Sequence, residues 1–476
     1  MSKKKQKSIE ELLEEALVPE EEQPYKVPEN WVWVKAESIT EIVGGGTPKT
    51  TVKEYYENGN IPWITPADLS DFKDIYISRG QRNITEEGLK NSSAKLLPEK
   101  TVLLSSRAPI GYVAIAANPL STNQGFKSFI PSKVIDSEYL YWYLKGSQKY
   151  LESMGSGSTF KEISASKCKE IKIPLPHINE QRRIAEKIER LFAKIDEAKR
   201  LIEEVKESFE LRRAAILDKA FKGQLGTNDP DEKSMLEISD VITEKDLIPE
   251  EEQMYEVPEN WVWVKAGDIT DIVGGGTPKT TVKEYYENGD IPWITPADLS
   301  DFEDIYISRG QRNITKEGLK NSSAKLLPEK TVLLSSRAPI GYVAIAANPL
   351  STNQGFKSFI PSNVIDSEYL YWYLKRSRKY LESMGSGSTF KEISASRCKE
   401  IKIPLPPINE QKRIAEKLSN LLSKLDNEKK LVLDFEEKLN SLKQSILNKA
   451  FRGELGTNDP TDEHAIELLK EVLKSK

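Results

Sequence analysis

The chain has 476 residues, of which 38% are hydrophobic and 30% are charged. This length suits about three domains or fewer, and the composition is that of a folded protein rather than a disordered one. No apolar stretch reaches the ~18–20 residues that cross a bilayer, and the charged N-terminus lacks the apolar region of a signal peptide. Two cysteines cannot build a disulfide framework, so we expect a cytoplasmic protein with no membrane partner.

The sequence is dominated by a direct repeat. Residues 27–176 return without a gap as residues 257–406, with 10 differences in 150 positions. The net charge of −5 is unevenly distributed, because each copy carries +2 and the remaining residues carry −9. This charge permits a nucleic-acid partner for the copies but does not by itself indicate one. We expect both copies to bind the same kind of ligand.

Each copy has the pattern of a compact domain. A short helical tail at 1–26 is followed at 27–177 by brief apolar segments separated by Gly, Pro and Asn turns, and the same pattern recurs at 257–407. These segments predict strands with a few helices. We therefore expect an α+β fold with two near-identical globular domains.

The pattern changes to heptads at 178–223 and again at 408–453. Apolar residues spaced by four and three predict two long helices, each of which needs a partner for its seam, and the obvious partner is the other helix. We favour an antiparallel coiled coil, because a parallel pair would require the linker at 224–256 to run back ~60 Å. The seam residues are Ile184, Ile188, Leu191, Ile195, Ile202, Val205 and Phe209 in the first helix, and Ile414, Leu418, Leu421, Leu425, Val432, Phe435 and Leu439 in the second.

The chain ends much as it begins. The motif Leu225-Gly-Thr-Asn-Asp-Pro230 follows the first helix and returns as Leu455-Gly-Thr-Asn-Asp-Pro460 after the second. A helical pattern like that of the N-terminal tail then closes the sequence. We expect the C-terminal tail, 454–476, to pack near the N-terminus.

Catalytic motifs are missing from the sequence. His177 and His464 are the only histidines, and both lie outside the repeated stretch, which excludes Ser-His-Asp and Cys-His arrangements there. Cys168 and Cys398 have no nearby histidine with which to form a zinc site. The glycine-rich stretches at 44–50 and 155–160 fit neither the phosphate-loop nor the dinucleotide pattern. We therefore expect no catalytic residue, no metal and no cofactor.

The loops of the copies instead carry side chains that suit nucleic-acid contacts. Arginine pairs with guanine, asparagine and glutamine pair with adenine, and lysine, serine and threonine serve phosphates. Taken singly, each such residue is more often an ordinary turn residue. The candidate DNA-binding residues are Lys49, Thr50, Arg82, Arg107, Asn123, Gln124, Lys127, Ser156, Ser158, Thr159 and Lys161, with Lys279, Thr280, Arg312, Arg337, Asn353, Gln354, Lys357, Ser386, Ser388, Thr389 and Lys391 in the second copy.

A series of motifs occurs twice in the same order. They are Trp31-Val-Trp-Val34, Gly44-Gly-Gly-Thr-Pro48, Ile61-Pro-Trp-Ile-Thr-Pro-Ala-Asp-Leu69, Ser121-Thr-Asn-Gln-Gly125, Gly157-Ser-Thr-Phe-Lys-Glu-Ile163 and, most specific, Ile173-Pro-Leu-Pro-His-Ile-Asn-Glu-Gln181. Over nearly the whole chain, this order before heptad helices resembles the specificity subunit of type I restriction–modification systems.

The resemblance implies a non-catalytic subunit with two target-recognition domains, each reading half of a bipartite double-stranded DNA sequence. It also implies that the two helices set the spacer and dock two methyltransferase subunits, and that restriction subunits add cleavage. Adenine methylation with S-adenosylmethionine would belong to the assembled partners. Family members usually carry two different recognition domains, and this chain departs from that pattern. If antiparallel helices relate like domains by a two-fold axis, the target should have inverted-repeat halves.

The alternative from another class is a non-DNA adaptor with two identical protein-binding modules on a coiled-coil spacer. The salt dependence of duplex binding distinguishes the two hypotheses. Binding that weakens steeply with salt favours DNA, whereas insensitivity to salt favours the adaptor.

Overall fold

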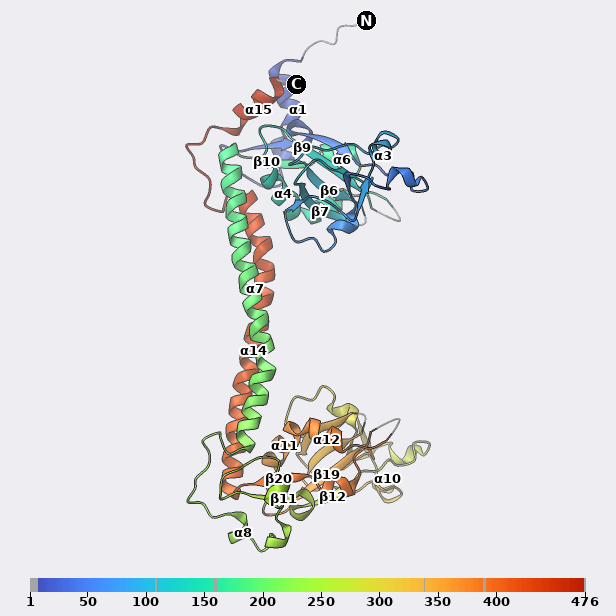
Figure 1. Cartoon of the computed structure of the whole chain (residues 1–476), viewed down its shortest axis with the longest axis vertical. Coiled ribbons are helices and arrows are strands. Elements are labelled where there is room, and N and C mark those ends of the chain that lie inside the picture. The colour runs from blue at the N-terminus through green and yellow to red at the C-terminus, as the bar shows by residue number, and fades with distance from the viewer. Residues whose placement is uncertain (1–6, 108, 158–160, 338, 388–390, 475–476) are drawn as a thin grey trace. The chain divides into compact units, whose positions relative to one another are not determined.

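The computed structural model describes residues 7–107, 109–157, 161–337, 339–387 and 391–474. The chain divides into two compact units, one formed by Met1–Ile202 with Asp434–Lys476 and the other by Glu203–Leu433. Each unit holds one copy of the repeat, the first part of one long helix and the last part of the other (Figure 1). Neither unit is therefore made from one half of the sequence alone.

The core of the first copy is a five-stranded sheet in the order β2-β9-β6-β7-β4. All neighbours are antiparallel except β4 and β7, which run parallel. Every residue of the central strand β6 is buried, as expected for a strand covered on both faces. The strands are β2 (Thr40–Gly44), β4 (Tyr76–Ile77), β6 (Val102–Ser106), β7 (Ile110–Ala116) and β9 (Phe126–Pro131).

A three-stranded sheet, β5-β3-β8, lies beside this core, and a two-stranded sheet, β1-β10, joins the start and end of the copy. Strand β3 is antiparallel to β5 and parallel to β8. These strands are β1 (Val32–Lys35), β3 (Ile61–Ile64), β5 (Arg82–Ile84), β8 (Ser121–Thr122) and β10 (Lys172–Leu175). The helices of the copy are α2 (Ala36–Ile39), α3 (Glu86–Lys90), α4 (Ser137–Gly146), α5 (Gln148–Met154) and α6 (Ala165–Lys169).

Helix α4 joins the sheet to the long helices. Asp136 caps its N-terminus by accepting hydrogen bonds from two backbone N–H groups, and α4 packs on β7. Its other face meets the end of the second long helix, where Phe451 contacts Tyr139 and Tyr143 edge-on at centroid distances of 5.4 and 5.1 Å. This explains why the six aromatic and leucine residues 139–144 are all buried.

The second copy repeats this architecture, with sheets β12-β19-β16-β17-β14, β15-β13-β18 and β11-β20. Its strands are β11 (Val262–Lys265), β12 (Thr270–Gly274), β13 (Ile291–Ile294), β14 (Tyr306–Ile307), β15 (Arg312–Ile314), β16 (Val332–Ser336), β17 (Ile340–Ala346), β18 (Ser351–Thr352), β19 (Phe356–Pro361) and β20 (Lys402–Leu405). Its helices are α9 (Ala266–Ile269), α10 (Lys316–Lys320), α11 (Ser367–Arg376), α12 (Arg378–Met384) and α13 (Ala395–Lys399). The predicted pair of α/β domains is confirmed.

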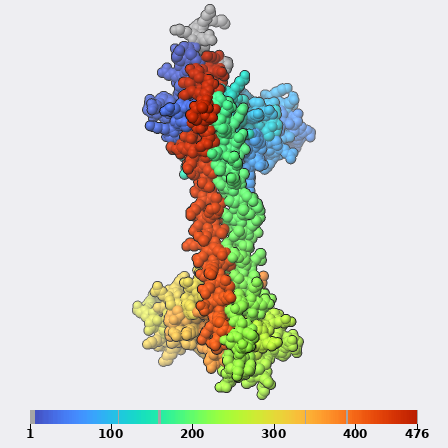
Figure 2. Space-filling model, turned by 90° about the vertical axis from the view of Figure 1, so that its left-hand side faces the viewer, coloured from blue at the N-terminus to red at the C-terminus, as the bar shows by residue number. Residues whose placement is uncertain are grey.

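The long helices α7 (Ile178–Phe221) and α14 (Ile408–Phe451) pack antiparallel within each unit, as predicted (Figures 1 and 2). In the second unit Arg212 pairs with Glu428 at 2.8 Å and Glu210 pairs with Lys429 at 3.4 Å, so residue numbers rise in opposite directions along the two helices. In the first unit the early part of α7 meets the late part of α14.

The two predicted seam positions differ in burial. Ile188, Ile195, Ile202 and Phe209, spaced by seven, are all buried, and in α14 Leu418, Leu425 and Leu439 are buried while Val432 between them is half-buried. The other series starts with the buried Ile184 and Ile414, passes through the half-buried Leu191 and Leu421, and reaches Val205 and Phe435, which are 40% and 52% exposed.

The seam prediction is therefore wrong at Val205 and Phe435. The physical reason is that the same heptad position is occupied by Arg212 and Glu428, whose ion pair at 2.8 Å lies in water-accessible surface, although both heptad positions of a two-stranded coil normally face the partner. The first residues of the series are covered by the α/β domains. Val205 and Phe435, with the exposed Leu201, Leu211, Leu431, Leu433 and Leu442, are called the exposed apolar residues of the long helices.

The repeated motif after each helix docks on the start of the other helix. In the second unit, Arg413 of α14 donates to both oxygens of Glu232, at 2.9 and 2.7 Å, and to the carbonyl of Thr227 at 3.1 Å. In the first unit, Arg183 of α7 makes the equivalent bond to the carbonyl of Thr457 at 3.0 Å. In each unit, the segment after one long helix thus binds the start of the other long helix.

The remaining helices are α1 (Ile9–Ala16), α8 (Met235–Ile238) and α15 (Ala465–Lys474), with short 3-10 turns between elements. Helix α15, near the C-terminus, packs on α1, near the N-terminus. Within the described ranges, no helix has both the length and the apolar character that a membrane crossing requires.

We predict that Arg413→Ala lowers the free energy of unfolding by about 1–3 kcal/mol, because a bidentate charged pair and a linker contact are lost together. Urea unfolding of the full chain measures the change. The matched control is Lys429→Ala, whose exposed pair with Glu210 should contribute about 0.2–1 kcal/mol. Equal losses in the two variants would contradict a closing role for the linker.

Candidate nucleic-acid interface

The glycine-rich loop after β2 is packed against the domain rather than free. A Cβ atom on Gly45 would lie 1.9 Å from the carbonyl oxygen of Asn123, so only glycine fits there. The Trp63 indole donates to the carbonyl of Gly46 at 3.0 Å. The loop that carries Lys49 is consequently fixed on the three-stranded sheet.

The loop after β8 meets the glycine-rich loop. The side-chain oxygen of Asn123 accepts a hydrogen bond from the N–H of Gly125 at 2.9 Å, which shapes a tight turn. The exposed side chain of Gln124 contacts the hydroxyl of Thr47. The structure therefore brings the loops that carry Lys49, Asn123 and Gln124 together at one end of the sheet, although the side-chain oxygen of Asn123 serves the turn.

A second group of predicted residues surrounds Glu162 and is called the Glu162 cluster. Lys127 is only 9% exposed, and its ammonium donates to Glu162 at 3.1 Å and to Ser106 at 3.3 Å. The guanidinium of Arg107 lies 3.7 Å from the other Glu162 oxygen. The sequence pattern predicts that Lys127 contacts phosphate, but the structure places it inside the domain. Its charge is already paired there with Glu162.

The two groups are neighbours. The N–H of Ser106 donates to the carbonyl of Gly125 at 2.7 Å, which joins the Glu162 cluster to the loop after β8. Ser156 is exposed, and its backbone pairs with that of Glu162. Lys161, which precedes Glu162 in the chain, is also exposed. The predicted contacts Ser158, Thr159, Ser388 and Thr389 lie outside the described residues.

Strand β5 contributes residues that the sequence interpretation missed. Around the predicted Thr50 and Arg82 lies an open concavity of about 470 Å³, called the β5 concavity, whose lining also includes Lys53, Tyr56, Glu57, Gln81 and Asn83. The signal was available in the sequence, since Gln81-Arg-Asn83 sets three planar hydrogen-bonding side chains in a row.

The second copy forms the same arrangement. Lys357, also buried, donates to Glu392 at 3.0 Å and to Ser336 at 3.2 Å, and Arg337 lies 3.9 Å from Glu392. The remaining candidates occupy equivalent places, namely Lys279, Thr280, Arg312, Asn353, Gln354, Ser386 and Lys391. None of the ten positions at which the copies differ is a candidate contact.

Comparison with known proteins identifies the family to which the chain belongs. The family model for the type I restriction modification DNA specificity domain matches residues 28–207 and 258–434. The chain belongs to the family of type I restriction–modification specificity subunits. The MjaIX specificity subunit of Methanocaldococcus jannaschii, a type I restriction enzyme, is 32% identical to this specificity subunit over 437 residues, which are 90% of this chain and 94% of the relative.

Solved structures share the fold of this specificity subunit. The HsdS subunit from Thermoanaerobacter tengcongensis superposes with a TM-score of 0.65 at 22% identity, covering 91% of this chain and 99% of that one. A chain from a structure of the type I R-M system gives a TM-score of 0.61 at 23% identity, covering 91% of this chain and 100% of that one. At these identities the likeness concerns the fold.

No cluster of three or more His, Cys, Asp or Glu residues suited to a metal ion occurs among the described residues. Burial raises the pKa of both Cys168 and Cys398 to about 12, so neither thiol ionises near neutral pH.

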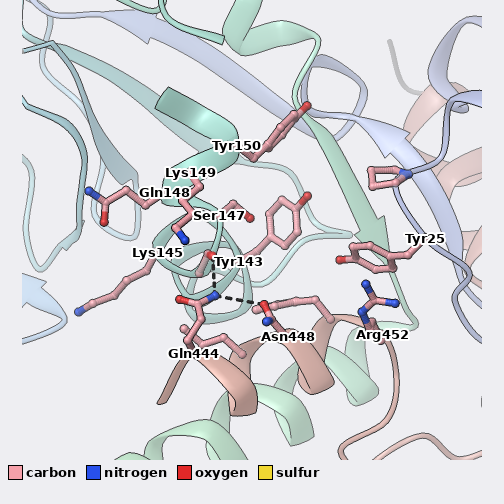
Figure 3. A pocket seen from close by; sticks show the side chains of 14 residues that line it. Tyr25, Tyr143, Lys145, Ser147, Gln148, Lys149, Tyr150, Gln444, Asn448 and Arg452 are labelled. Carbon is pink, nitrogen blue, oxygen red and sulfur yellow. Dashed lines mark hydrogen bonds between the residues drawn. The ribbon is translucent and has the colours of Figure 1, made fainter. Parts of the chain in front are cut away.

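The copies of the specificity subunit differ most in side-chain size where each packs on a helix end. Beside Gly146 a cavity of about 510 Å³ opens toward α14, and Gln444 donates to the Gly146 carbonyl at 3.1 Å (Figure 3). In the second copy Arg376 stands at this position and donates to Asp218 of α7 at 2.7 Å. This difference adapts each copy to its helix and leaves the candidate contacts alike.

We predict that Glu162→Ala destabilises the specificity subunit by about 2 kcal/mol, because it leaves the Lys127 ammonium buried without its carboxylate. Adding Lys127→Met should recover most of the loss, since the buried charge is then removed. Urea unfolding measures both variants against Glu41→Asp, which introduces the residue found at the equivalent position 271. A double variant that is less stable than Glu162→Ala would contradict this interpretation.

Proposed function

We propose that this chain is the DNA-reading subunit of a type I restriction–modification complex, with target-recognition domains at 27–177 and 257–407. One observation carries the proposal. Each unit presents the same set of arginine, glutamine, asparagine, lysine and threonine side chains around its three-stranded sheet, in a family whose model is described as a DNA specificity domain. Such side chains supply both base and phosphate contacts.

The proposed partners are duplex DNA, two methyltransferase subunits and restriction subunits, and this chain supplies no catalytic residue of its own. The exposed apolar residues of the long helices support docking of methyltransferase helices, because Leu211 and Leu431 are 73% and 68% exposed there. A further helix that covered them would remove apolar surface from water. The structural neighbour from the type I R-M system is described in the context of complex assembly, which agrees with this role.

The connectivity supports a symmetric DNA target. Helix α7 begins in the first unit and ends in the second, α14 does the reverse, and the two helices are antiparallel in both. A reciprocal exchange of like parts is the connectivity of a two-fold symmetric pair. We propose that the two recognition domains read like half-sites on opposite strands, so that the target is an inverted repeat around a spacer.

The first prediction from this proposal concerns the methylated sequence. The full chain, assembled with its methyltransferase subunits, should methylate bipartite sites whose halves are inverted repeats, because the candidate contacts of the domains are identical. Sequencing of methylated adenines in the DNA of an expressing cell reads the sites directly. Unrelated halves or directly repeated halves would sink the symmetry argument.

The second prediction concerns assembly. Leu211→Asp combined with Leu431→Asp should weaken co-purification of methyltransferase subunits by about tenfold or more, because two exposed apolar anchors become charged. The unfolding free energy should change little, since both side chains are exposed. The matched control is Leu96→Asp, a 52% exposed leucine of the first recognition domain. Unchanged co-purification would place the docking surface elsewhere.

A further inference from the structure

Strand β5 is an edge strand with a rigid backbone. Among the described strands it pairs only with β3, where Arg82 lies opposite Trp63, so no strand covers its other edge. The carboxylate of Asp68 accepts the N–H of Gln81 at 2.8 Å with one oxygen and the N–H and hydroxyl of Thr65, both at 2.7 Å, with the other. The carboxylate of Asp68 therefore fixes the backbone at the start of the strand, and the strand's exposed side chains remain available for other contacts.

The walls of the β5 concavity are also fixed. The Tyr56 hydroxyl donates to the carbonyl of Pro48 at 2.6 Å, and its ring packs edge-on against Trp63 at 5.9 Å. Asn83 donates to the carbonyl of Gly59 at 3.0 Å. A site built on such supports holds its shape when a ligand arrives.

Two planar side chains at the start of β5 are available for a ligand, Gln81 just before the strand and Arg82 as its first residue. Among the described residues, no hydrogen bond or ion pair engages the Arg82 guanidinium or the Gln81 amide, and both residues are exposed. Arg107 of the Glu162 cluster, by contrast, faces a carboxylate at 3.7 Å. Because Arg107 would have to exchange that carboxylate for a base, Arg82 is better placed to gain energy from a new partner.

The second copy repeats this site. Its concavity, of about 460 Å³, is lined by the equivalent residues, among them Lys283, Tyr286, Gln311 and Arg312. None of the lining positions differs in residue type between the copies. A feature that recurs unchanged in both domains is what two readers of like half-sites require.

We propose that the β5 concavity, rather than the Glu162 cluster, determines base specificity in each recognition domain. Gln81 and Arg82 contact base edges, Lys53 and Thr50 hold the adjoining phosphate, and Gln311 and Arg312 do the same in the second domain. This inference rests on the proposed function and names the residues that perform it.

The chemistry of these side chains identifies the ligand. Arginine matches O6 and N7 of guanine, and glutamine matches N6 and N7 of adenine, in each case through two hydrogen bonds on the major-groove edge. Glu57, which also lines the concavity, can accept a hydrogen bond from cytosine N4 on the opposite strand. The ligand is thus duplex DNA approached from its major groove, with a guanine facing Arg82 and an adenine facing Gln81.

The duplication supplies an internal control for the test. The full chain, assembled with its methyltransferase subunits, is incubated with a pool of randomised duplexes, and the bound duplexes are sequenced. Arg82→Ala or Gln81→Ala should reduce the base preference at one or two positions of a single half-site by about tenfold or more, while the other half-site keeps its preference. Arg312→Ala and Gln311→Ala should have the same effect on the opposite half.

Two further variants sharpen the interpretation. Arg82→Lys keeps the charge but cannot form the planar pair, so it should lose base preference while retaining most of the affinity for unselected duplexes. Lys73→Glu, which introduces the residue at the equivalent position 303, should change neither. Thermal unfolding should be similar for all these exposed positions.

The outcomes separate this inference from the proposed function. If the wild-type complex selects a bipartite site and the Arg82 and Gln81 variants select the same site unchanged, the β5 concavity does not read bases. Loss of preference in Arg107→Ala alone would also overturn the inference, in favour of the Glu162 cluster. A wild-type complex that selects no sequence overturns the proposed function, and this inference with it.

Discussion

The structure depends on the packing of the two long helices, which is supported at both ends of the coil. Along the coil α7 buries one apolar residue per heptad, the series of Ile188, Ile195, Ile202 and Phe209. A single line of such contacts stabilises a helix pair far less than a complete bundle core does. The ends of the coil are where the structure adds support, through the aromatic contacts of Phe451 and the linker contacts of Arg413.

The candidate contacts and the structurally important differences between the copies lie in separate places. The candidate contacts lie on loops and on β5, around sheets whose cores form within each copy. The differences with a structural effect occur where a copy packs on a long helix. Gly146 and Arg376 show this, since each fits the helix end that packs beside it. Recognition can therefore be the same in both domains although their supports differ.

Much of the fold could be predicted because its main elements have patterns that are visible in short stretches of sequence. The repeat, the turn-separated strands and the heptads are periodic features that need no knowledge of distant contacts. The burial of Lys127 could not be predicted from local sequence, because its partner Glu162 lies 35 residues away. Nothing in the neighbouring residues shows that the charge of Lys127 is buried. The prediction is wrong at Val205 and Phe435 for a related reason, since the apolar pattern does not show how the charged Arg212 and Glu428 at the same heptad position affect burial.

The candidate site was predicted in part. Thr50, Arg82, Asn123 and Gln124 lie at one end of the three-stranded sheet, which motif composition suggested. Gln81 was missed because it directly precedes β5, a strand of only three residues that is too short for periodicity to show which side chains face outward.

The division of the chain into units has a consequence for synthesis on the ribosome. The unit Glu203–Leu433 is one continuous stretch, whereas its counterpart joins Met1–Ile202 to Asp434–Lys476. Domains generally fold as units, and those made first usually fold first. Here the unit that begins first is completed last, because its final 43 residues, Asp434–Lys476, are translated after the whole of Glu203–Leu433. A ribosome that stops early therefore releases a chain in which the older half is the incomplete one.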